Sequence, residues 1–281
     1  MSDPRLTPAN GRVAAVHLRD RVKAGKYVDG TPMRVCVPLA DLLRAPLGAR
    51  DRQLLLGEDV TCYEQHDGWA FVQSAKDGYV GYLPVTELTL QDADDTPNHR
   101  VIARTTHVYP EANFKTRELS SVSHGSRVKV LADHGRFAQT PLGFIPSAHL
   151  VPLTQVEPDP VRVAETFLGT PYLWGGNSGF GLDCSALVQA ACLACGIPCP
   201  GDSDMQETEL GRHLPRDAAL QRGDLLFWKG HVAWVADPDT LLHANAFHMA
   251  VAHEPLQDAI QRIKAQGDGP VTARKRLGEI T

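Results

Sequence analysis

Residues 181–188 read Gly-Leu-Asp-Cys-Ser-Ala-Leu-Val and follow a glycine-rich segment, residues 174–181, that reads Trp-Gly-Gly-Asn-Ser-Gly-Phe-Gly. An Asp directly before an apolar run is typical of a helix N-cap, so we predict a helix from Asp183 to about Cys195. Cys184 then lies in the first turn, where the positive end of the helix dipole favours the nucleophilic thiolate. Taken by itself, a free cysteine is more often a small buried side chain.

Two histidines downstream supply the partners that a thiol nucleophile needs. His231 begins an alternating run that we predict as a strand, and His243 ends the next short strand. Neighbouring antiparallel strands can bring the two rings side by side, so that one imidazole contacts Cys184 while the other orients it. His231 alone is more often a structural histidine. His248 and His253 are rivals for the third position, and the strand context favours His243.

The segment around these residues has an α+β pattern. Asp159 and Pro160 mark a first helix, because Asp caps a helix and Pro is tolerated in its first turn. A small antiparallel sheet is predicted to follow the two helices, within a catalytic domain of residues 156–281. The predicted strands of this sheet are residues 224–228, 231–235 and 241–244.

The blocks that carry the chemistry are residues 171–176, 181–188, 222–227 and 230–233, together with His243. In this order they resemble the NlpC-type cysteine peptidases, papain-like enzymes that cut peptides of bacterial cell-wall peptidoglycan. The resemblance implies that Cys184 is the nucleophile, His231 the general base and then acid, and His243 the polar third member. It also implies that Tyr172 lies near the oxyanion, with the backbone N–H of Cys184 as a second donor.

Residues 36–153 consist of short alternating runs cut by Gly, Pro and Asp, which is typical of small all-β modules. They contain an internal repeat: the segment from Gly57 to Leu88 is matched by the segment from Gly125 to Leu150. Both copies carry G-x-x-V and a later block of Gly, aromatic, aliphatic and Pro. The pattern resembles two bacterial SH3-like barrels in tandem.

The predicted fold class is therefore multidomain, with two small all-β SH3-like barrels followed by an α+β papain-like domain. Residues 1–35, which have a weak helical pattern, are expected to form an N-terminal arm. The predicted barrels cover residues 36–92 and 98–155, with a polar linker at residues 91–98.

This arrangement is similar to the γ-D-glutamyl-diamino-acid dipeptidyl peptidases of murein peptide recycling. The resemblance implies that the first module recognises the free α-amine of an N-terminal L-Ala through Glu58 and Tyr79, since a carboxylate and a phenol can hold an ammonium group. The second module has Ser126 and Pro141 at the matching positions and is predicted to be structural. The other residues expected to bind substrate are Trp174, Asp183, Ser185, Asp202 and Ser203.

The predicted function is that of a cysteine peptidase that hydrolyses the bond from γ-D-Glu to meso-diaminopimelate or L-Lys. Its substrate would be a murein tripeptide or tetrapeptide with a free L-Ala amine. No cofactor is implied, because the protein supplies nucleophile, base and oxyanion donors. An acyltransferase or amidase of the same fold, or a module that only binds cell-wall peptide, remains an alternative. The preferred diamino acid and the oligomeric state stay open.

Composition excludes other classes of protein. The 281 residues carry a net charge of −5 without a Lys/Arg cluster, so we expect no nucleic-acid partner. The sequence contains no apolar stretch long enough to span a bilayer and no signal-like N-terminus, so we expect a cytoplasmic protein with no membrane partner.

The six cysteines are expected to be mostly reduced thiols, because a chain of this size needs no disulfides to stabilise its core. Cys192, Cys195 and Cys199 suggest a metal site, yet no fourth ligand stands at a zinc-site spacing. We therefore predict no metal and interpret every cysteine except Cys184 as core packing.

Overall fold

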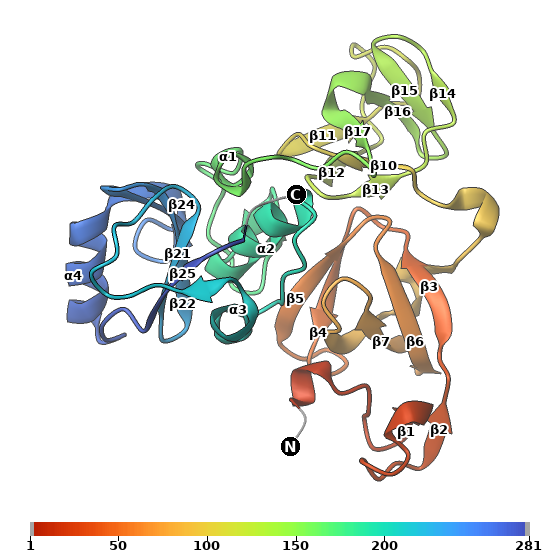
Figure 1. The fold of residues 1–281 in the computed structure, drawn as a ribbon. Helices are drawn as coiled ribbons and strands as arrows, with labels where there is room; N and C mark the ends of the chain where they lie inside the picture. The colour runs from red at the N-terminus through yellow and green to blue at the C-terminus, as the bar shows by residue number, and fades with distance from the viewer. Residues whose placement is uncertain (1–2, 279–281) are drawn as a thin grey trace. The chain divides into compact units, whose positions relative to one another are not determined.

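A computed structural model describes residues 3–278, and in it the chain divides into two compact units, one ending at Leu153 and the other beginning at Thr154. Short strands dominate the first unit (Figure 1). Within the described residues, all α-helices lie in the second unit.

A seven-stranded antiparallel sheet makes up much of the first unit, in the order β5-β4-β8-β7-β6-β3-β9. Between β6 and β7 the turn residues Asp67 and Gly68 have φ values of 50° and 79°, as a tight hairpin turn requires. The strands are β3 (Thr31–Val35), β4 (Leu39–Leu43), β5 (Arg50–Leu55), β6 (Asp59–His66), β7 (Trp69–Ser74), β8 (Val80–Pro84) and β9 (Leu88–Leu90). Their core contains Met33, Leu42, Leu54, Val60, Val72, Leu83 and Leu88.

The first residues of the chain differ from the predicted arm with a helical pattern. They form two short parallel strands and two 3-10 turns instead of an α-helix, and residues 31–35 already belong to the large sheet. The helical prediction was wrong because the apolar residues lie in one short segment, bounded by Gly11 and Gly25, that is marginal as an isolated helix, and Val13–Ala15 pairs with Lys26–Val28 instead. The elements are η1 (Pro4–Leu6), β1 (Val13–Ala15), η2 (Val16–Leu18) and β2 (Lys26–Val28).

Residues 99–152 form a second set of strands with a core of its own, in three small antiparallel sheets. The repeated apolar positions Val128, Ile145 and Leu150 lie in this core, and their counterparts lie in the first core. The strands are β10 (His99–Val101), β11 (Thr105–Val108), β12 (Ser120–Ser123), β13 (Arg127–Val128), β14 (Ala132–Asp133), β15 (Phe137–Thr140), β16 (Gly143–Pro146) and β17 (Leu150–Pro152). The 3-10 turns of both sets are η3 (Val85–Glu87), η4 (Ala93–Asp95) and η5 (Ser147–His149).

The turn before β6 packs closely against the second set of strands. Leu56 lies in the second core, and its carbonyl accepts the N–H of Arg127 at 2.8 Å. Gly57 has a φ of 79°, and a Cβ there would lie 2.1 Å from the carbonyl oxygen of Arg127. Both the backbone conformation and the close approach therefore require glycine.

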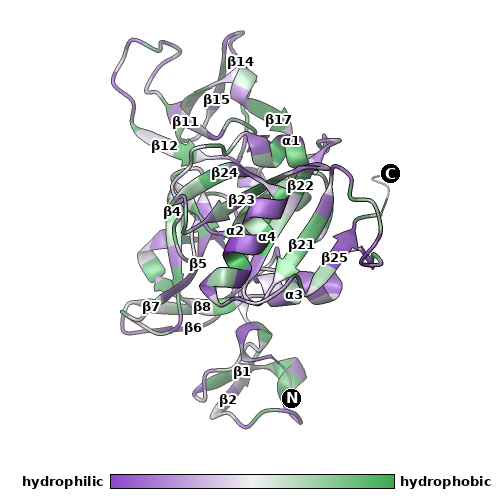
Figure 2. Cartoon of the chain, turned by 90° about the vertical axis from the view of Figure 1, so that its left-hand side faces the viewer, coloured by the Kyte–Doolittle hydropathy of each residue, from purple (hydrophilic) through white to green (hydrophobic). Residues whose placement is uncertain are grey.

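A six-stranded antiparallel sheet, in the order β20-β25-β21-β22-β23-β24, forms the centre of the second unit (Figure 1). Its central strands are apolar, as the green of β21 and β22 in Figure 2 shows. The strands are β20 (Arg212–His213), β21 (Asp224–Trp228), β22 (His231–Asp237), β23 (Thr240–Asn245), β24 (Ala250–Pro255) and β25 (Ala273–Arg276). A separate short hairpin contains β18 (Asn177–Ser178) and β19 (Gly181–Leu182).

Helices cover both faces of this sheet. Leu225 and Trp234 pack in the core shared with α1 and α2, whereas Leu226 and Val235 pack in the core shared with α4. The α+β prediction identified the central strands, but it missed the second helical layer. The helices are α1 (Pro160–Glu165), α2 (Cys184–Ala194), α3 (Ser203–Glu209) and α4 (Leu256–Gln266).

The first two helices begin where their caps predict. Asp159 Oδ1 accepts the N–H of Val161 at 2.9 Å, and Asp183 Oδ1 accepts the N–H of Ala186 at 2.8 Å. In the described part of the chain, we find no helix with the combined length and apolarity that crossing a membrane requires.

Candidate active site

Cys184 is the first residue of α2 and is 6% exposed. Its sulfur accepts a hydrogen bond from the backbone N–H of Val232, the residue after His231, so the helix start lies against the start of β22. Burial, followed by the negative charge of Asp183, raises the pKa of the Cys184 thiol to about 12. Burial and Asp183 thus favour the neutral thiol and act against the predicted preference for a thiolate.

Asp183 joins the glycine-rich loop to the start of α2. Its Oδ2 accepts the N–H of Gly175 at 3.1 Å, and its Oδ1 accepts the hydroxyl of Ser185 at 2.9 Å as well as the helix N–H. Gln206 supports the same turn by donating to the carbonyl of Ser185 at 2.9 Å. Since these side chains bond within the protein, substrate contact by Asp183 and Ser185 stays a prediction.

A chain of hydrogen bonds leads from His231 into the protein. His231 Nε2 lies 2.9 Å from His243 Nδ1, and His243 Nε2 lies 3.0 Å from Glu254 Oε2. An ionised carboxylate only accepts, so His243 carries its proton on Nε2 and accepts from His231 through Nδ1. His231 then carries its proton on Nε2, which leaves its Nδ1 with a free lone pair.

The charge states follow from burial and pairing. Burial, with the neighbouring His243, lowers the pKa of His231 to about 3, and burial also lowers the pKa of His243. Burial alone would raise the pKa of Glu254, but hydrogen bonds from Arg262 and His243 outweigh it and lower that pKa to about 2. At neutral pH the site therefore holds a neutral thiol, two neutral imidazoles and one carboxylate.

Glu254 and Arg262 are members of the site that sequence reasoning missed. Arg262 on α4 donates to the two carboxylate oxygens of Glu254 at 2.8 and 2.7 Å. Glu254 follows Ala252 by two positions on β24, and Ala252 lies opposite His243, so alternation directs Glu254 toward the same face. This signal needs the pairing of β23 with β24, which the sequence does not contain.

The histidine that hydrogen-bonds to His231 is His243 and not one of its two rivals. His253 is opposite Leu242 and exposed, and the exposed His248 contacts Asn245 Oδ1 at 3.0 Å. The structure thus brings His243 against His231.

Tyr172 and His231 border a pocket of about 620 Å³ between the sheet and α4. Burial, then the nearby Cys184 and Asp183, raises the pKa of Tyr172, so its phenol remains a hydrogen-bond donor. Trp174 is 73% exposed. Asp202 and Ser203 lie at the start of α3 and do not line this pocket.

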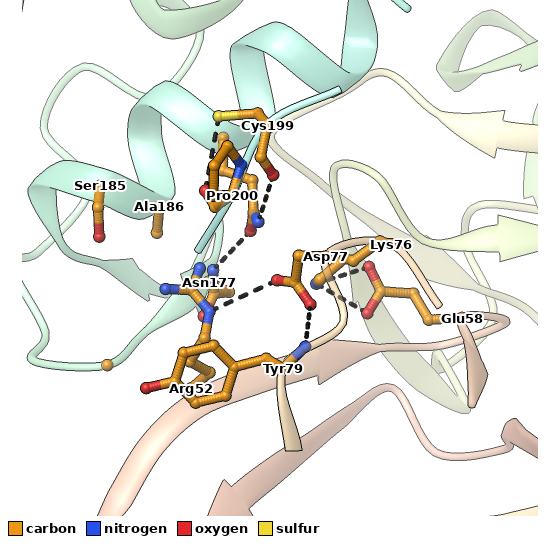
Figure 3. Close-up of polar contacts among 12 residues, drawn as sticks. Arg52, Glu58, Lys76, Asp77, Tyr79, Asn177, Ser185, Ala186, Cys199 and Pro200 are labelled. Atoms are coloured by element: carbon orange, nitrogen blue, oxygen red, sulfur yellow. Dashed lines mark hydrogen bonds and ion pairs between the residues drawn. The ribbon is translucent and has the colours of Figure 1, made fainter. Parts of the chain in front are cut away.

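Glu58 and Tyr79, predicted to hold a substrate amine, are both buried residues of the first unit, and Figure 3 shows the contacts of Glu58 with Lys76. Both carboxylate oxygens of Glu58 accept from the Lys76 ammonium at 2.8 Å. The Arg52 guanidinium lies 5.7 Å from the centre of the Tyr79 ring. Glu58 therefore binds an ammonium group in this structure, and that group is the side chain of Lys76.

His243, His248 and Glu254 are the candidates for metal ligands among the described residues, with ligand atoms within 4.8 Å of one another. However, Arg262 already neutralises Glu254, and both nitrogens of His243 have partners. A cation would have to displace Arg262, so the residues present do not fit a resident metal.

All six cysteines are free thiols. Cys192, Cys195 and Cys199 are buried in the core around α2, as the packing prediction expects. Cys36 is exposed, so its assignment to core packing was wrong, because it follows the last residue of β3 rather than an inward position.

A buried thiol at a helix start, beside a strand that begins with a histidine bonded to a second polar residue, is the arrangement of a cysteine peptidase. Residues 169–264 match the model of the NlpC/P60 family, which is a family of cysteine peptidases, and residues 42–88 match the bacterial dipeptidyl-peptidase SH3 domain. The chain therefore carries an NlpC/P60 domain preceded by an SH3 domain.

Relatives and a solved structure agree with these matches. The γ-D-glutamyl-L-lysine dipeptidyl-peptidase of Bacillus cereus is 29% identical over 73% of this chain and 70% of its own length. The protein of the same name from Bacillus subtilis is 31% identical over 63% of each chain. A crystal structure of an NlpC/P60 family protein from Bacillus cereus matches 88% of this chain and 99% of its own, with a TM-score of 0.74 at 22% identity, which shows a shared fold.

Proposed function

We propose that this chain hydrolyses the bond between γ-D-Glu and the diamino acid of murein peptides that carry a free N-terminal L-Ala. The observation that carries the proposal is the position of Cys184 at the start of α2, hydrogen-bonded to the residue after His231, with His243 and Glu254 behind that histidine. The names of the two Bacillus relatives support the choice of bond.

The mechanism begins with the neutral Cys184 thiol and the neutral His231 imidazole. The free Nδ1 of His231 takes the thiol proton of Cys184 as the sulfur attacks the γ-carbonyl carbon of D-Glu. The charge on His231 is then balanced by Glu254 through His243, which are already aligned. His231 returns the proton to the leaving amine, and the diamino acid departs from a thioester on Cys184. Water, activated by His231, hydrolyses the thioester and restores the thiol.

The oxyanion of both steps needs donors that are in place before reaction. The Tyr172 phenol and the backbone N–H of Cys184 are the proposed donors. A phenol whose pKa is raised stays protonated through the cycle, which supports this role.

The first unit would select the amino end of the substrate. Glu58 and Tyr79 are the proposed partners of the L-Ala amine, although Lys76 occupies both carboxylate oxygens of Glu58 in this structure. The substrate amine would have to compete with Lys76. Trp174, Asp202 and Ser203 remain proposed contacts in the second unit.

We assign residues 98–155 as a second, structural SH3-like domain. The separate core with matching repeat positions supports this assignment. A preference for peptides already freed from the glycan would suit recycling of murein peptides inside the cell, which is the place we propose for the protein.

Digestion of L-Ala-γ-D-Glu-L-Lys and its meso-diaminopimelate counterpart, read by product mass, tests the proposal. We expect free diamino acid and L-Ala-γ-D-Glu, no turnover by Cys184→Ala, and unchanged turnover by Cys36→Ala, which removes an exposed thiol outside the site. N-acetylated peptides should react much more slowly. Activity retained by Cys184→Ala would refute the mechanism, and equal rates on free and acetylated peptides would refute amine recognition.

A further inference from the structure

A pocket of about 620 Å³ has His231 in its lining, so an amine that His231 protonates can lie against this pocket. The histidine that returns a proton to the leaving amine must face that amine, and His231 is part of the pocket lining. Lys229 and Gly230, the turn between β21 and β22, form one wall with it, and residues of α4 and the segment after it form another.

Two charges that the protein does not use face this pocket. Within residues 3–278, neither the Lys229 ammonium nor the Asp268 carboxylate makes a hydrogen bond or ion pair. Arg262 also lines the pocket, but Glu254 binds its guanidinium. Among its described lining residues, the pocket therefore offers one cation, Lys229, and one anion, Asp268, that pair with no other group.

The pocket also has an apolar wall. Phe247, in the turn between β23 and β24, is 59% exposed, and its ring is held by the Arg262 guanidinium 4.5 Å from the ring centre. An exposed aromatic ring beside two opposite charges suits a ligand that is charged at both ends and aliphatic between them.

We propose that this pocket binds the leaving diamino acid, with Lys229 pairing the α-carboxylate and Asp268 the side-chain ammonium. Lys229 lines the same pocket as His231, and the amine that His231 protonates is bonded to the α-carbon that carries this carboxylate. The methylene chain then lies along Phe247. This inference rests on the proposed function and adds that the substrate ends at the diamino acid, because a further residue would remove the carboxylate charge.

Three peptides and two variants test the pairing. The peptides are L-Ala-γ-D-Glu-L-Lys, its C-terminal carboxamide and its norleucine counterpart. Each altered peptide should lose about fivefold in kcat/KM with the unaltered protein, since ion pairs of exposed residues contribute up to about 1 kcal/mol. Lys229→Met should lose about fivefold on the parent peptide and nothing further on the carboxamide. Asp268→Asn should lose the same on the parent peptide and nothing further on the norleucine peptide.

Lys264→Met and Asp258→Asn, which remove exposed charges of α4 outside the pocket, serve as matched controls and should change no rate. If Lys229→Met lowers kcat/KM equally on the parent and carboxamide peptides, or changes neither value, the assignment of Lys229 to the carboxylate is wrong. If Asp268→Asn lowers kcat/KM equally on the parent and norleucine peptides, or changes neither value, the assignment of Asp268 to the ammonium is wrong. Failure of the unaltered protein to cleave the parent peptide would instead overturn the proposed function. Binding of the three peptides to Cys184→Ala, measured by calorimetry, would then still test the pocket.

Discussion

Glu254 determines which ring nitrogen of His243 carries the proton. The position of that proton in turn determines which nitrogen of His231 has the free lone pair. The carboxylate accepts a hydrogen bond from the Nε2–H of His243, His243 Nδ1 accepts one from the Nε2–H of His231, and His231 Nδ1 remains a base. Arg262 holds the carboxylate in place with two charge-assisted hydrogen bonds. Glu254 is therefore a positioning residue.

Glu254→Gln should lower kcat by about a hundredfold, the lower range of what general acid–base catalysis contributes. The amide can donate to His243 Nε2, which moves the His243 proton to Nδ1 and reverses the bond to His231. Nitrogen-15 NMR of the histidine rings would show this change of tautomer. Glu165→Gln, which alters a carboxylate paired with Arg222 instead, should leave both readouts unchanged. An unaltered tautomer with unaltered kcat would contradict the role of Glu254.

At the scale of elements, two turns with the same backbone conformation differ in what surrounds them. Gly57 and Gly68 both have a φ of 79°, but a Cβ at Gly57 would lie 2.1 Å from the Arg127 carbonyl oxygen, whereas a Cβ at Gly68 would meet nothing within 4 Å. Only the first turn is pressed against another set of strands.

Gly68→Ala should therefore cost about 1–2 kcal/mol of the free energy of unfolding, the cost of a left-handed backbone for a residue with a Cβ. Gly57→Ala should cost about 1–3 kcal/mol more, because the backbone of Arg127 must move. Urea unfolding of the two variants beside the unaltered protein measures the difference. Equal losses would show that the two sets of strands separate easily at this turn.

At the scale of the whole molecule, each unit contains histidines that fold in the neutral form. Burial lowers the pKa of His231 to about 3 and that of His124 to about 4, and it lowers the pKa of His243 as well. A histidine in the unfolded chain has a pKa of about 6.5. Between these values the unfolded chain binds more protons than the folded one.

The free energy of unfolding should therefore be fully retained above about pH 6.5 and decrease as the pH falls from there toward 4. Urea unfolding at a series of pH values measures the slope. His124→Asn should make the slope of the first unit smaller, and His134→Asn, which removes an exposed histidine of the same unit, should not. A stability that does not change between pH 7 and 5 would contradict neutral burial of these rings.

The sequence by itself determined the local features. Asp159 and Asp183 identify two helix starts, alternation identifies β21 to β23, and the order of motifs identifies the NlpC/P60 domain, because caps, periodicity and motif spacing are all encoded within short segments. The weak helical pattern of the first residues was misleading, since pairing between distant strands outweighs a short apolar run.

Only the tertiary structure decided what depends on contacts between distant segments. The partnership of His243 with Glu254 and Arg262 follows from the pairing of β23 with β24 and the packing of α4. The neutral state of Cys184 follows from burial, which a position at a helix start does not reveal. The Glu58–Lys76 ion pair and the free charges of Lys229 and Asp268 likewise depend on which side chains the fold brings together. Segments 181–188 and 230–235 contain the reacting groups, and the fold around them determines the protonation states and the neighbours of these groups.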